Sequence, residues 1–335
     1  MPDPSTPALP FRRWAVTGGT GLVGNNLVRR LVAGGADVRV LSRRKPRREF
    51  AGLPVEEVEG DVTDAASLER LCAGAECVVH AAALVEIRHG GRDEFERVNV
   101  AGTAAMLRAV PRGARLVYVS TVDALGLRDR ANPADEDTEP QPHEGGVPYV
   151  DTKRAADRLV LDSAQDWVIV YPTYMLGPWD WRPSSGRMLL EVARGQALFA
   201  PPGGNNFVHI DDVVTGLLAA AGRPRGGRWI LGNENLSYAE AWTLMAEVTG
   251  ARRPLATLPR WAVSAAVPPL HAARKLGLRE GDINAAAVAM SRVPHYFSAQ
   301  RARAELGLPA TPIRQAVHDA WTWFKLQGIA PGTPT

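Results

Sequence analysis

Residues 17–24 read TGGTGLVG, and this glycine-rich stretch decides the fold of the 335-residue chain. It follows a short apolar run at 14–16 and opens a segment whose apolar positions have helical spacing, which predicts a strand, a tight turn and a helix. The glycines fit Gly-x-Gly-x-x-Gly from Gly19 and also Gly-x-x-Gly-x-x-Gly from Gly18. Glycine allows a tight turn and a close approach of the backbone to a pyrophosphate. The stretch therefore predicts a dinucleotide site at the N-terminus of the helix.

The composition is that of a globular protein with a sizeable core, since 45% of the residues are hydrophobic and 22% are charged. The length suits one large domain or two closely joined ones. The net charge is +3, and much of the basic excess lies in residues 43–48. No interleaved aromatic residue or nucleic-acid motif accompanies that run, so we expect no nucleic-acid partner.

The cysteine content and the apolar runs indicate the compartment. Cys72 and Cys77 have no histidine cluster beside them, so we expect two buried thiols in a reducing environment and no zinc. No apolar run approaches the roughly 20 residues that a membrane span requires. Residues 1–11 are proline-rich and lack the order of a signal peptide, which predicts a disordered leader. Together these features predict a cytoplasmic protein.

Strand-like and helix-like segments alternate through the first half of the chain. Repeated units of this kind form a parallel sheet with helices on both faces. The fold class expected is therefore α/β, a Rossmann-type doubly wound parallel sheet, with a smaller and mainly helical C-terminal substrate-binding part. Ligands of such sheets bind at the carboxyl ends of the strands, where the glycine turn would lie. The predicted strands are 14–16, 38–41, 55–58, 77–79, 116–119 and 167–170.

The alternation of strands and helices ends in the second half of the chain, and the domain boundaries follow from this change. We assign 12–176 to the cofactor-binding domain, to which 206–233 returns, and 177–205 with 234–330 to a substrate-binding domain. The segment 177–206 is rich in Gly, Pro and Trp and is long for a connection, which is typical of a wall or lid of a pocket. Its Trp179 and Trp181 either line an apolar pocket or anchor the segment to the core.

The catalytic chemistry is predicted by Tyr149 and Lys153, which are four residues apart on a predicted helix at 149–164 and so share one face. The ammonium would lower the pKa of the phenol and make it an acid or base near neutrality. Thr121, or its neighbour Ser120, follows the strand at 116–119 and would orient a substrate carbonyl.

Together the motifs resemble those of the extended short-chain dehydrogenases/reductases of the NAD-dependent epimerase/dehydratase family. The similarity covers roughly 12–324 and is greatest to the dihydroflavonol-reductase-like subgroup, which includes bacterial hopanoid-associated sugar epimerases. It implies a catalytic set of Thr121, Tyr149 and Lys153, a structural Asn99 and a homodimer. Besides the glycine stretch and the Tyr-x-x-x-Lys pair, it rests on the segments 60–64, 80–83, 98–103, 119–121, 171–173 and 208–212.

The glycine turn, the basic segment and this resemblance predict the ligand contacts. Substrate contacts are assigned to Ser120, Asp123, Trp179, Trp181 and His209, and His209 is expected to be structural or at the pocket edge rather than a metal ligand. The expected cofactor contacts are Gly18, Thr20, Gly21, Leu22, Val23, Gly24, Ser42, Arg43, Asp61, Val62, Ala81, Ala82, Ala83, Tyr149, Lys153, Pro172 and Thr173.

The end of the second predicted strand favours NADP(H) over NAD(H), while leaving NAD(H) open. NAD sites carry an acidic residue about 20 residues past the glycine turn to hold the ribose 2′-hydroxyl. This chain has Ser42 and Arg43 at that place, and no carboxylate. Arg43 would pair with a 2′-phosphate, and Ser42 would add a hydrogen bond. Lys45, Arg47 and Arg48 are expected to be solvated.

The function expected is NADP(H)-dependent reduction of a ketone or aldehyde, or oxidation of the secondary alcohol, in a small, largely non-nucleotide substrate. The alternative is a nucleotide-sugar epimerase or dehydratase with tightly bound NAD. Relatives of that kind carry a basic residue before the position of Phe207, and dehydratases carry an Asp-Glu pair where this chain has Asp123 alone. Other arginines of 182–194 are able to substitute, so the alternative stays open. A non-catalytic regulator is disfavoured because the Tyr and the Lys are both present.

Overall fold

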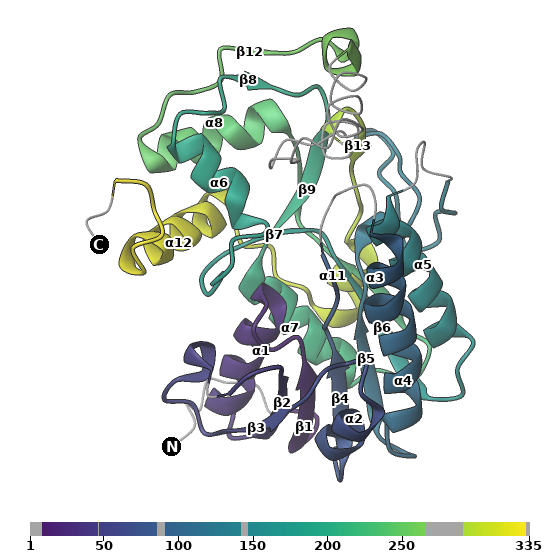
Figure 1. The fold of residues 1–335 in the computed structure, drawn as a ribbon. Coiled ribbons are helices and arrows are strands. Elements are labelled where there is room, and N and C mark those ends of the chain that lie inside the picture. Colours follow the sequence, from purple (N-terminus) through teal and green to yellow (C-terminus); the bar gives the residue numbers. More distant parts are fainter. Residues whose placement is uncertain (1–8, 46, 86–90, 142–146, 266–290, 333–335) are drawn as a thin grey trace.

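The computed structural model describes residues 9–45, 47–85, 91–141, 147–265 and 291–332. Its main sheet has seven strands in the order β10-β6-β5-β4-β1-β2-β3, and every neighbouring pair is parallel (Figure 1). The predicted Rossmann-type class is confirmed. The strands are β1 (Arg13–Thr17), β2 (Asp37–Ser42), β3 (Val55–Glu59), β4 (Cys77–His80), β5 (Arg115–Val119), β6 (Asp166–Pro172) and β10 (Arg228–Leu231).

Helices cover both faces of this sheet (Figure 1). One layer contains α1 and α7, which pack on each other, and the other contains α2, α4 and α5, of which α4 contacts both neighbours. Residues 92–109 form a short α-helix, a π-helical stretch and a second α-helix in succession. The helical segments are α1 (Leu22–Ala33), η1 (Arg48–Phe50), α2 (Ala65–Cys72), α3 (Arg92–Phe95), η2 (Glu96–Ala101), α4 (Gly102–Ala109), η3 (Val122–Ala124), α5 (Pro148–Leu161) and α7 (Ile210–Ala221).

The C-terminal part contains a second sheet that the sequence did not predict. β9 lies between β11 and β13 and also pairs with β7. A separate hydrophobic core, which includes Phe207, Met245 and Phe324, fills the space between this sheet and its helices. The elements are β7 (Tyr174–Leu176), α6 (Gly186–Ala193), β8 (Phe199–Ala200), β9 (Gly204–His209), β11 (Glu234–Ser237), α8 (Tyr238–Thr249), β12 (Ala256–Thr257), β13 (Pro294–His295), α11 (Gln300–Leu306) and α12 (Ile313–Leu326).

The end of the expected leader and both cysteines pack in or against the main core. Leu9 and Phe11, at the end of the expected leader, pack against the main core. Both cysteines are free and buried, as expected. Among the described residues, no helix is long and apolar enough to cross a membrane.

The glycine turn between β1 and α1 is packed against the backbone on two sides. Gly18 has a φ of 71°, and a Cβ on it would lie 2.6 Å from the carbonyl carbon of Ala81. A Cβ on Gly24 would lie 2.2 Å from the Gly18 carbonyl oxygen, inside the same turn. The strand–turn–helix unit therefore requires glycine at both positions, which fits the Gly-x-x-Gly-x-x-Gly reading.

Gly24→Ala should destabilise the protein by roughly 1–3 kcal/mol, because the new methyl group meets backbone that has no room to move. Thermal and urea unfolding measure the loss. Gly222→Ala is the matched control, since a Cβ there has its nearest neighbour, the Ala219 oxygen, at an ordinary 3.6 Å. Equal stability of the two variants would contradict the tight turn.

Candidate active site

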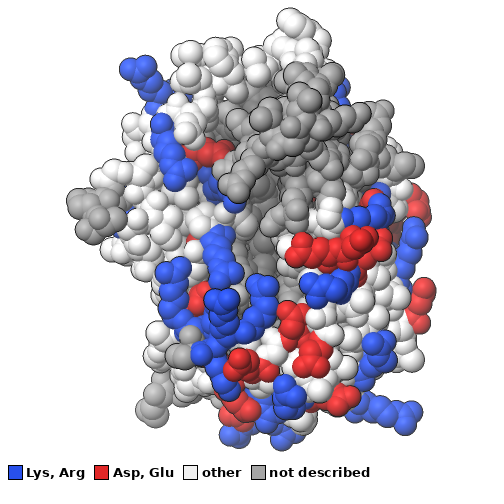
Figure 2. Space-filling model, viewed as in Figure 1, with Lys and Arg blue, Asp and Glu red and all other residues white. Residues whose placement is uncertain are grey.

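The N-terminus of α1 faces the cleft with unblocked backbone donors. Gly21 caps the helix, no acidic residue occupies its first turn, and the amides of Leu22 and Val23 lie in that turn. A Cβ added to Gly21 would have only the Gly18 oxygen within 4 Å, at 3.4 Å. Lys and Arg side chains gather over α1 and the segment after β2 on the face shown in Figure 2. The turn thus fits a diphosphate group.

Polar groups at the ends of β2 and β3 fit the adenosine part of a dinucleotide. The hydroxyl of Ser42 is buried, with Ser42 3% exposed, and has no hydrogen-bond partner among the described residues. Arg43 beside it is exposed. Burial raises the pKa of Asp61, but hydrogen bonds from Thr63 and the charges of Arg43 and Arg97 outweigh it and keep that pKa low.

The end of β4 is held in place by Asn99 from the π-helical stretch. The side chain of Asn99 accepts a hydrogen bond from the Leu84 amide at 2.8 Å and donates to the Leu84 carbonyl oxygen at 3.2 Å. It also donates to the hydroxyl of Thr152 on α5 at 3.1 Å. Residues 81–83 lie half-buried in the segment so fixed, directly beside the glycine turn. The expected structural role of Asn99 agrees with these contacts.

The remaining predicted cofactor contacts lie at neighbouring strand ends. Thr20 lies in the turn, and Val62 follows Asp61 after β3. Pro172 ends β6, and the Thr173 amide donates to the Leu231 carbonyl oxygen at the end of β10. The sites predicted from separate motifs therefore all lie at the carboxyl edge of one parallel sheet.

Thr121 and Tyr149 form the centre of the predicted catalytic set. Thr121 follows β5 and Tyr149 lies in the first turn of α5, and the Thr121 side chain lies near enough to influence the pKa of Tyr149. Both residues are buried. Lys153 lies one turn further along α5 and is 3% exposed, as expected from the spacing.

The predicted effect of Lys153 on Tyr149 is not seen in this structure. Burial, with the charge of Asp123 next in size, raises the pKa of Tyr149 instead of lowering it. The Lys153 ammonium donates to the hydroxyl of Tyr118 at 2.8 Å and to the Val119 carbonyl oxygen at 2.9 Å. Burial lowers the pKa of Lys153 to about 8, against the opposing effect of Asp157.

Ser120, the alternative to Thr121, has a different partner. Its hydroxyl donates to Asp157 of α5 at 2.6 Å, and both residues are buried. Burial raises the pKa of Asp157 to about 6. Ser120 is thus engaged in joining β5 to α5, whereas the Thr121 hydroxyl is bonded to Asp123 two residues further along the chain.

A buried hydrogen-bond network joins the glycine turn to the catalytic helix. Nδ1 of His80 lies 2.8 Å from the Thr17 hydroxyl, and Nε2 lies 3.1 Å from the Thr103 hydroxyl. Thr103 donates to the carbonyl oxygen of Asn99, which reaches α5 through Thr152. Burial lowers the pKa of His80 to about 3, so the ring is neutral. His89, whose sequence context predicts a packing or surface residue rather than a ligand, lies outside the described residues.

Asp123 is brought to the catalytic hydroxyls, together with a histidine that the sequence did not indicate. The Thr121 hydroxyl donates to Oδ2 of Asp123 at 3.2 Å. Oδ1 of Asp123 lies 3.3 Å from Nδ1 of His295, which ends β13. His295 belongs to no recognised motif, so only the tertiary structure identifies it.

The two tryptophans and His209 have packing partners instead. Trp179 and Trp181 lie against Trp323 of α12, with ring centroids 6.0 and 5.1 Å away. This favours the anchoring alternative over the pocket wall. His209 caps α7 by accepting from the Asp211 amide, and its Nε2 lies 3.2 Å from Asp319.

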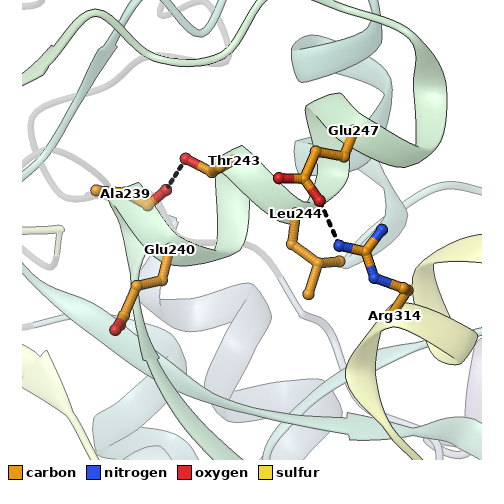
Figure 3. Close-up of a pocket in the computed structure, with 6 residues that line it drawn as sticks. All are labelled: Ala239, Glu240, Thr243, Leu244, Glu247 and Arg314. Carbon is orange, nitrogen blue, oxygen red and sulfur yellow. Dashed lines mark hydrogen bonds and ion pairs between the residues drawn. The ribbon is translucent and has the colours of Figure 1, made fainter.

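A surface pocket lies against α8, away from all the predicted site residues. Arg314 forms an ion pair with Glu247 at one end, and Thr243 donates to the Ala239 carbonyl oxygen at the other. Its surroundings supply no group suited to the predicted chemistry. The pocket is lined by Ala239, Glu240, Thr243, Leu244, Glu247 and Arg314 (Figure 3).

The fold and the site define a nucleotide-binding enzyme built on a doubly wound sheet. Residues 14–232 match the model of the NAD dependent epimerase/dehydratase family, and the chain belongs to this family. The resemblance inferred from the motifs is confirmed. The protein is thus an oxidoreductase or epimerase of the extended short-chain dehydrogenase/reductase type, with a pyridine-nucleotide cofactor.

Similar proteins include both reductases and epimerases. The chain is 35% identical over 326 residues to a Synechocystis sp. protein named provisionally as a dihydroflavonol 4-reductase, covering 93% of this chain and 94% of that protein. It is 35% identical over 325 residues to sterol demethylase protein B of Methylococcus capsulatus, covering 94% and 98%. A nucleoside-diphosphate-sugar epimerase structure from Pseudomonas aeruginosa is 25% identical with a TM-score of 0.77, covering 95% and 99%.

Lys153→Met should remove a pH dependence of stability. The pKa of Lys153 is about 8 in the folded protein and 10.5 as its ordinary value, so the unfolded chain binds more protons between these values. The free energy of unfolding of the wild type should therefore rise with pH across that window, by roughly 3 kcal/mol relative to the variant. Urea unfolding at about pH 7 and about pH 10 measures the difference. The exposed Lys325→Met is the control, and an equal rise in all three proteins would contradict the buried ammonium.

Proposed function

We propose that the protein is an NADP(H)-dependent oxidoreductase that reduces a ketone or aldehyde, or oxidises the corresponding secondary alcohol, through Thr121, Tyr149 and Lys153. The observation that carries the proposal is the placement of the buried Thr121 and Tyr149 at the carboxyl edge of the sheet, where Thr121 influences the pKa of Tyr149, with Lys153 one helical turn away. Two hydroxyls in this position suit one carbonyl oxygen, which one donor orients and the other protonates.

Thr121, Tyr149 and Lys153 have different roles in the proposed proton transfer. When bound, the nicotinamide supplies a hydride to the carbonyl carbon or accepts one from the alcohol. Thr121 donates a hydrogen bond to the substrate oxygen. Tyr149 gives its proton to that oxygen, so that carbonyl, hydride and proton together make one alcohol. Its raised pKa keeps the proton on Tyr149 until the oxygen becomes strongly basic. Lys153 supplies a positive charge to this end of the cleft.

The preference for NADP(H) is supported by the end of β2. A buried hydroxyl without a partner is costly, and a ligand phosphate would satisfy that of Ser42. Arg43 is exposed beside it and able to pair with the same phosphate. The nearest following carboxylate, Glu49, is buried and forms an ion pair with Arg47 at 2.9 Å, so it is not offered to a ribose. The competing possibility, a solvated loop of arginines, would leave the Ser42 hydroxyl unsatisfied.

The substrate class proposed is small and largely non-nucleotide. The place where sugar-nucleotide enzymes were expected to carry a basic residue holds Asn206, which is buried and donates to Asn235 and to the Phe297 carbonyl oxygen. The similarity to the sterol demethylase protein and to the dihydroflavonol reductase adds support. The proposal includes a homodimer formed through α3, α4 and α5.

Tyr149→Phe should lower kcat at least a hundredfold while leaving the Kd for NADPH within about threefold, because the phenol is the proton donor. NADPH oxidation with phenanthrenequinone as the probe substrate measures turnover, and cofactor fluorescence measures binding. Tyr174→Phe is the control, since its hydroxyl donates to the Ser185 carbonyl oxygen in the C-terminal part. Near-normal turnover by Tyr149→Phe would refute the mechanism.

Native mass spectrometry separates the proposal from the alternative of a nucleotide-sugar epimerase or dehydratase. We expect the purified protein to carry no retained NAD and to take up NADPH. Retained NAD that persists through buffer exchange would favour the alternative, whose neighbours include the Pseudomonas aeruginosa epimerase.

Arg43→Ala should weaken NADPH binding about tenfold to a hundredfold, since a hydrogen-bonded charge pair contributes roughly 1.5–3 kcal/mol. The Kd for NADH should stay within about threefold, because NADH has no 2′-phosphate. The matched control is Arg44→Ala, which removes the neighbouring exposed charge. Equal weakening of NADPH binding by both substitutions would show general electrostatic attraction and contradict a specific phosphate contact.

A further inference from the structure

The end of the C-terminal part that lies away from the main sheet carries an exposed hydrophobic patch, at the top of Figure 1. Five of the eight large hydrophobic side chains that are exposed in the described chain belong to it, so these side chains are not scattered singly over the surface. Two of the five are 72% and 74% exposed. We name this patch the apolar edge, and its members are Leu198, Phe199, Leu255, Trp261 and Val293.

Backbone pairing brings two separate segments together at the apolar edge. β8 and β12 form a parallel pair in which Phe199 stands opposite Ala256. The Leu255 amide donates to the Leu198 carbonyl oxygen at 2.8 Å, so these two leucines are also neighbours across the pair. Phe199 and Leu198 are 49% and 41% exposed although they are consecutive and point to opposite faces of the strand. The pair is therefore a thin ribbon whose two faces are both open to solvent.

Trp261 and Val293 lie at the ends of this ribbon. The Leu258 amide donates to the last residue of β8 at 2.8 Å, which holds the chain directly before the helical segment that contains Trp261. Val293 precedes β13, and its carbonyl oxygen would lie 2.8 Å from a Cβ added to Gly203, three residues after β8. The five hydrophobic side chains therefore belong to one continuous region of the surface.

The charges within the apolar edge are all positive. The stretches 194–203 and 251–265 contain four arginines and no aspartate or glutamate. Arg253 forms an ion pair with Glu247 of α8 at 3.1 Å. The other three arginines are exposed, and none of them forms an ion pair with another described residue. They are Arg194, Arg252 and Arg260. Figure 2 shows basic and uncharged side chains along this upper edge of the molecule.

A lipid surface with negative headgroups fits this combination of side chains. A tryptophan and leucines that project from a thin ribbon enter the boundary between headgroups and acyl chains, where the fluid bilayer adapts to their shape. Guanidinium groups beside them pair with lipid phosphates. A protein interface has a packed centre within a polar rim, whereas Leu255 and Trp261 stand out from the surface with little lateral support.

We propose that the apolar edge docks on the surface of a bilayer that contains anionic lipids. Leu255 and Trp261 enter the boundary between headgroups and acyl chains, while Arg194, Arg252 and Arg260 contact the lipid phosphates. The contact is peripheral. It places the C-terminal part against the lipid and leaves the main sheet, at the opposite end of the molecule in Figure 1, facing water. This inference goes beyond the proposed function and does not depend on it.

Sedimentation of the full-length protein with lipid vesicles measures the interaction. Vesicles of phosphatidylcholine are compared with vesicles that also contain about one third phosphatidylglycerol. We expect the anionic vesicles to bind the protein at least about tenfold more tightly at low salt, since each arginine near the surface contributes roughly fivefold. The difference should shrink as the salt concentration rises, because salt screens the arginines from the headgroups.

Substitution of both projecting side chains tests the hydrophobic part of the contact. The double variant Leu255→Ser with Trp261→Ser should bind anionic vesicles at least about tenfold more weakly, because the apolar area that the bilayer covers is lost. Leu326→Ser is the matched control, since Leu326 is 77% exposed but lies at the end of α12, outside the apolar edge. Its binding should equal that of the wild type.

Substitution of two arginines tests the charged part. The double variant Arg252→Gln with Arg260→Gln should bind anionic vesicles roughly twentyfold more weakly and neutral vesicles as before. Arg112→Gln is the matched control, because Arg112 is exposed in the connection between α4 and β5, in the cofactor-binding part. An equal loss with Arg112→Gln would show attraction by the net charge of the protein and overturn the proposed site.

The remaining outcomes also decide the proposal. Failure of the wild type to bind anionic vesicles at low salt would overturn it, as would equal binding by the wild type and both double variants. Sedimentation equilibrium tests whether a second copy covers the apolar edge instead. Dissociation of an oligomer by Leu255→Ser with Trp261→Ser, with vesicle binding unchanged, would overturn the lipid contact. Thermal unfolding checks that the variants are folded, and if the serine variant is not, the arginine variant decides.

Discussion

The neutral ring of His80 joins the two halves of the site, and the geometry of both depends on it. The network requires Nδ1 to accept from the Thr17 hydroxyl, which itself accepts from the Ala82 amide, and Nε2 to donate to Thr103. Only the neutral ring can do both. Burial and then the charge of Lys153 keep the pKa of His80 at about 3, so the pattern persists at any physiological pH. The position of the cofactor turn relative to α5 is thereby fixed by hydrogen bonds in the interior.

Burial raises the pKa of Tyr149, and two nearby carboxylates, Asp123 and Asp157, raise it further. On one side the buried Lys153 faces Asp157, whose own pKa is raised to about 6 by burial. On the other side Asp123 contacts both Thr121 and His295. A cation alone would favour the tyrosinate, and a carboxylate alone would favour the phenol. Burial and the charge of Asp123 raise the pKa of Tyr149, whereas the Lys153 ammonium is held by Tyr118 and Val119, so a description of the proton affinity of Tyr149 through Lys153 alone is incomplete.

The sequence predicted the parts of the structure that local pattern determines. The inner strands β4, β5 and β6 are largely continuous apolar runs, as buried parallel strands require, and the glycine turn and the Tyr149–Lys153 spacing are local as well. The second sheet was missed because β7, β11 and β13 have two to four residues each, too few for a period. His295 was missed for a related reason. The pairing of β13 with β9 brings His295 beside Asp123. The local sequence around His295 gives no indication of that pairing.

The packing of Trp179 and Trp181 explains how the C-terminal part is attached. The φ of Trp179 is 67°, in the left-handed region that non-glycine residues rarely adopt. Such a backbone conformation persists only where packing compensates its strain. The Trp179 ring lies 3.3 Å from the guanidinium carbon of Arg29 on α1, and Arg48 lies over Trp181 at 5.0 Å. Stacking of this kind is favourable when partly desolvated. The C-terminal part contacts the cofactor-binding part at α1 through the tryptophans and at η3 through His295, and also through the ion pair of Glu240 with Arg130. A rotation between the two parts that left the tryptophan contact intact would still move His295 relative to Asp123, so the tryptophans alone do not fix the position of His295.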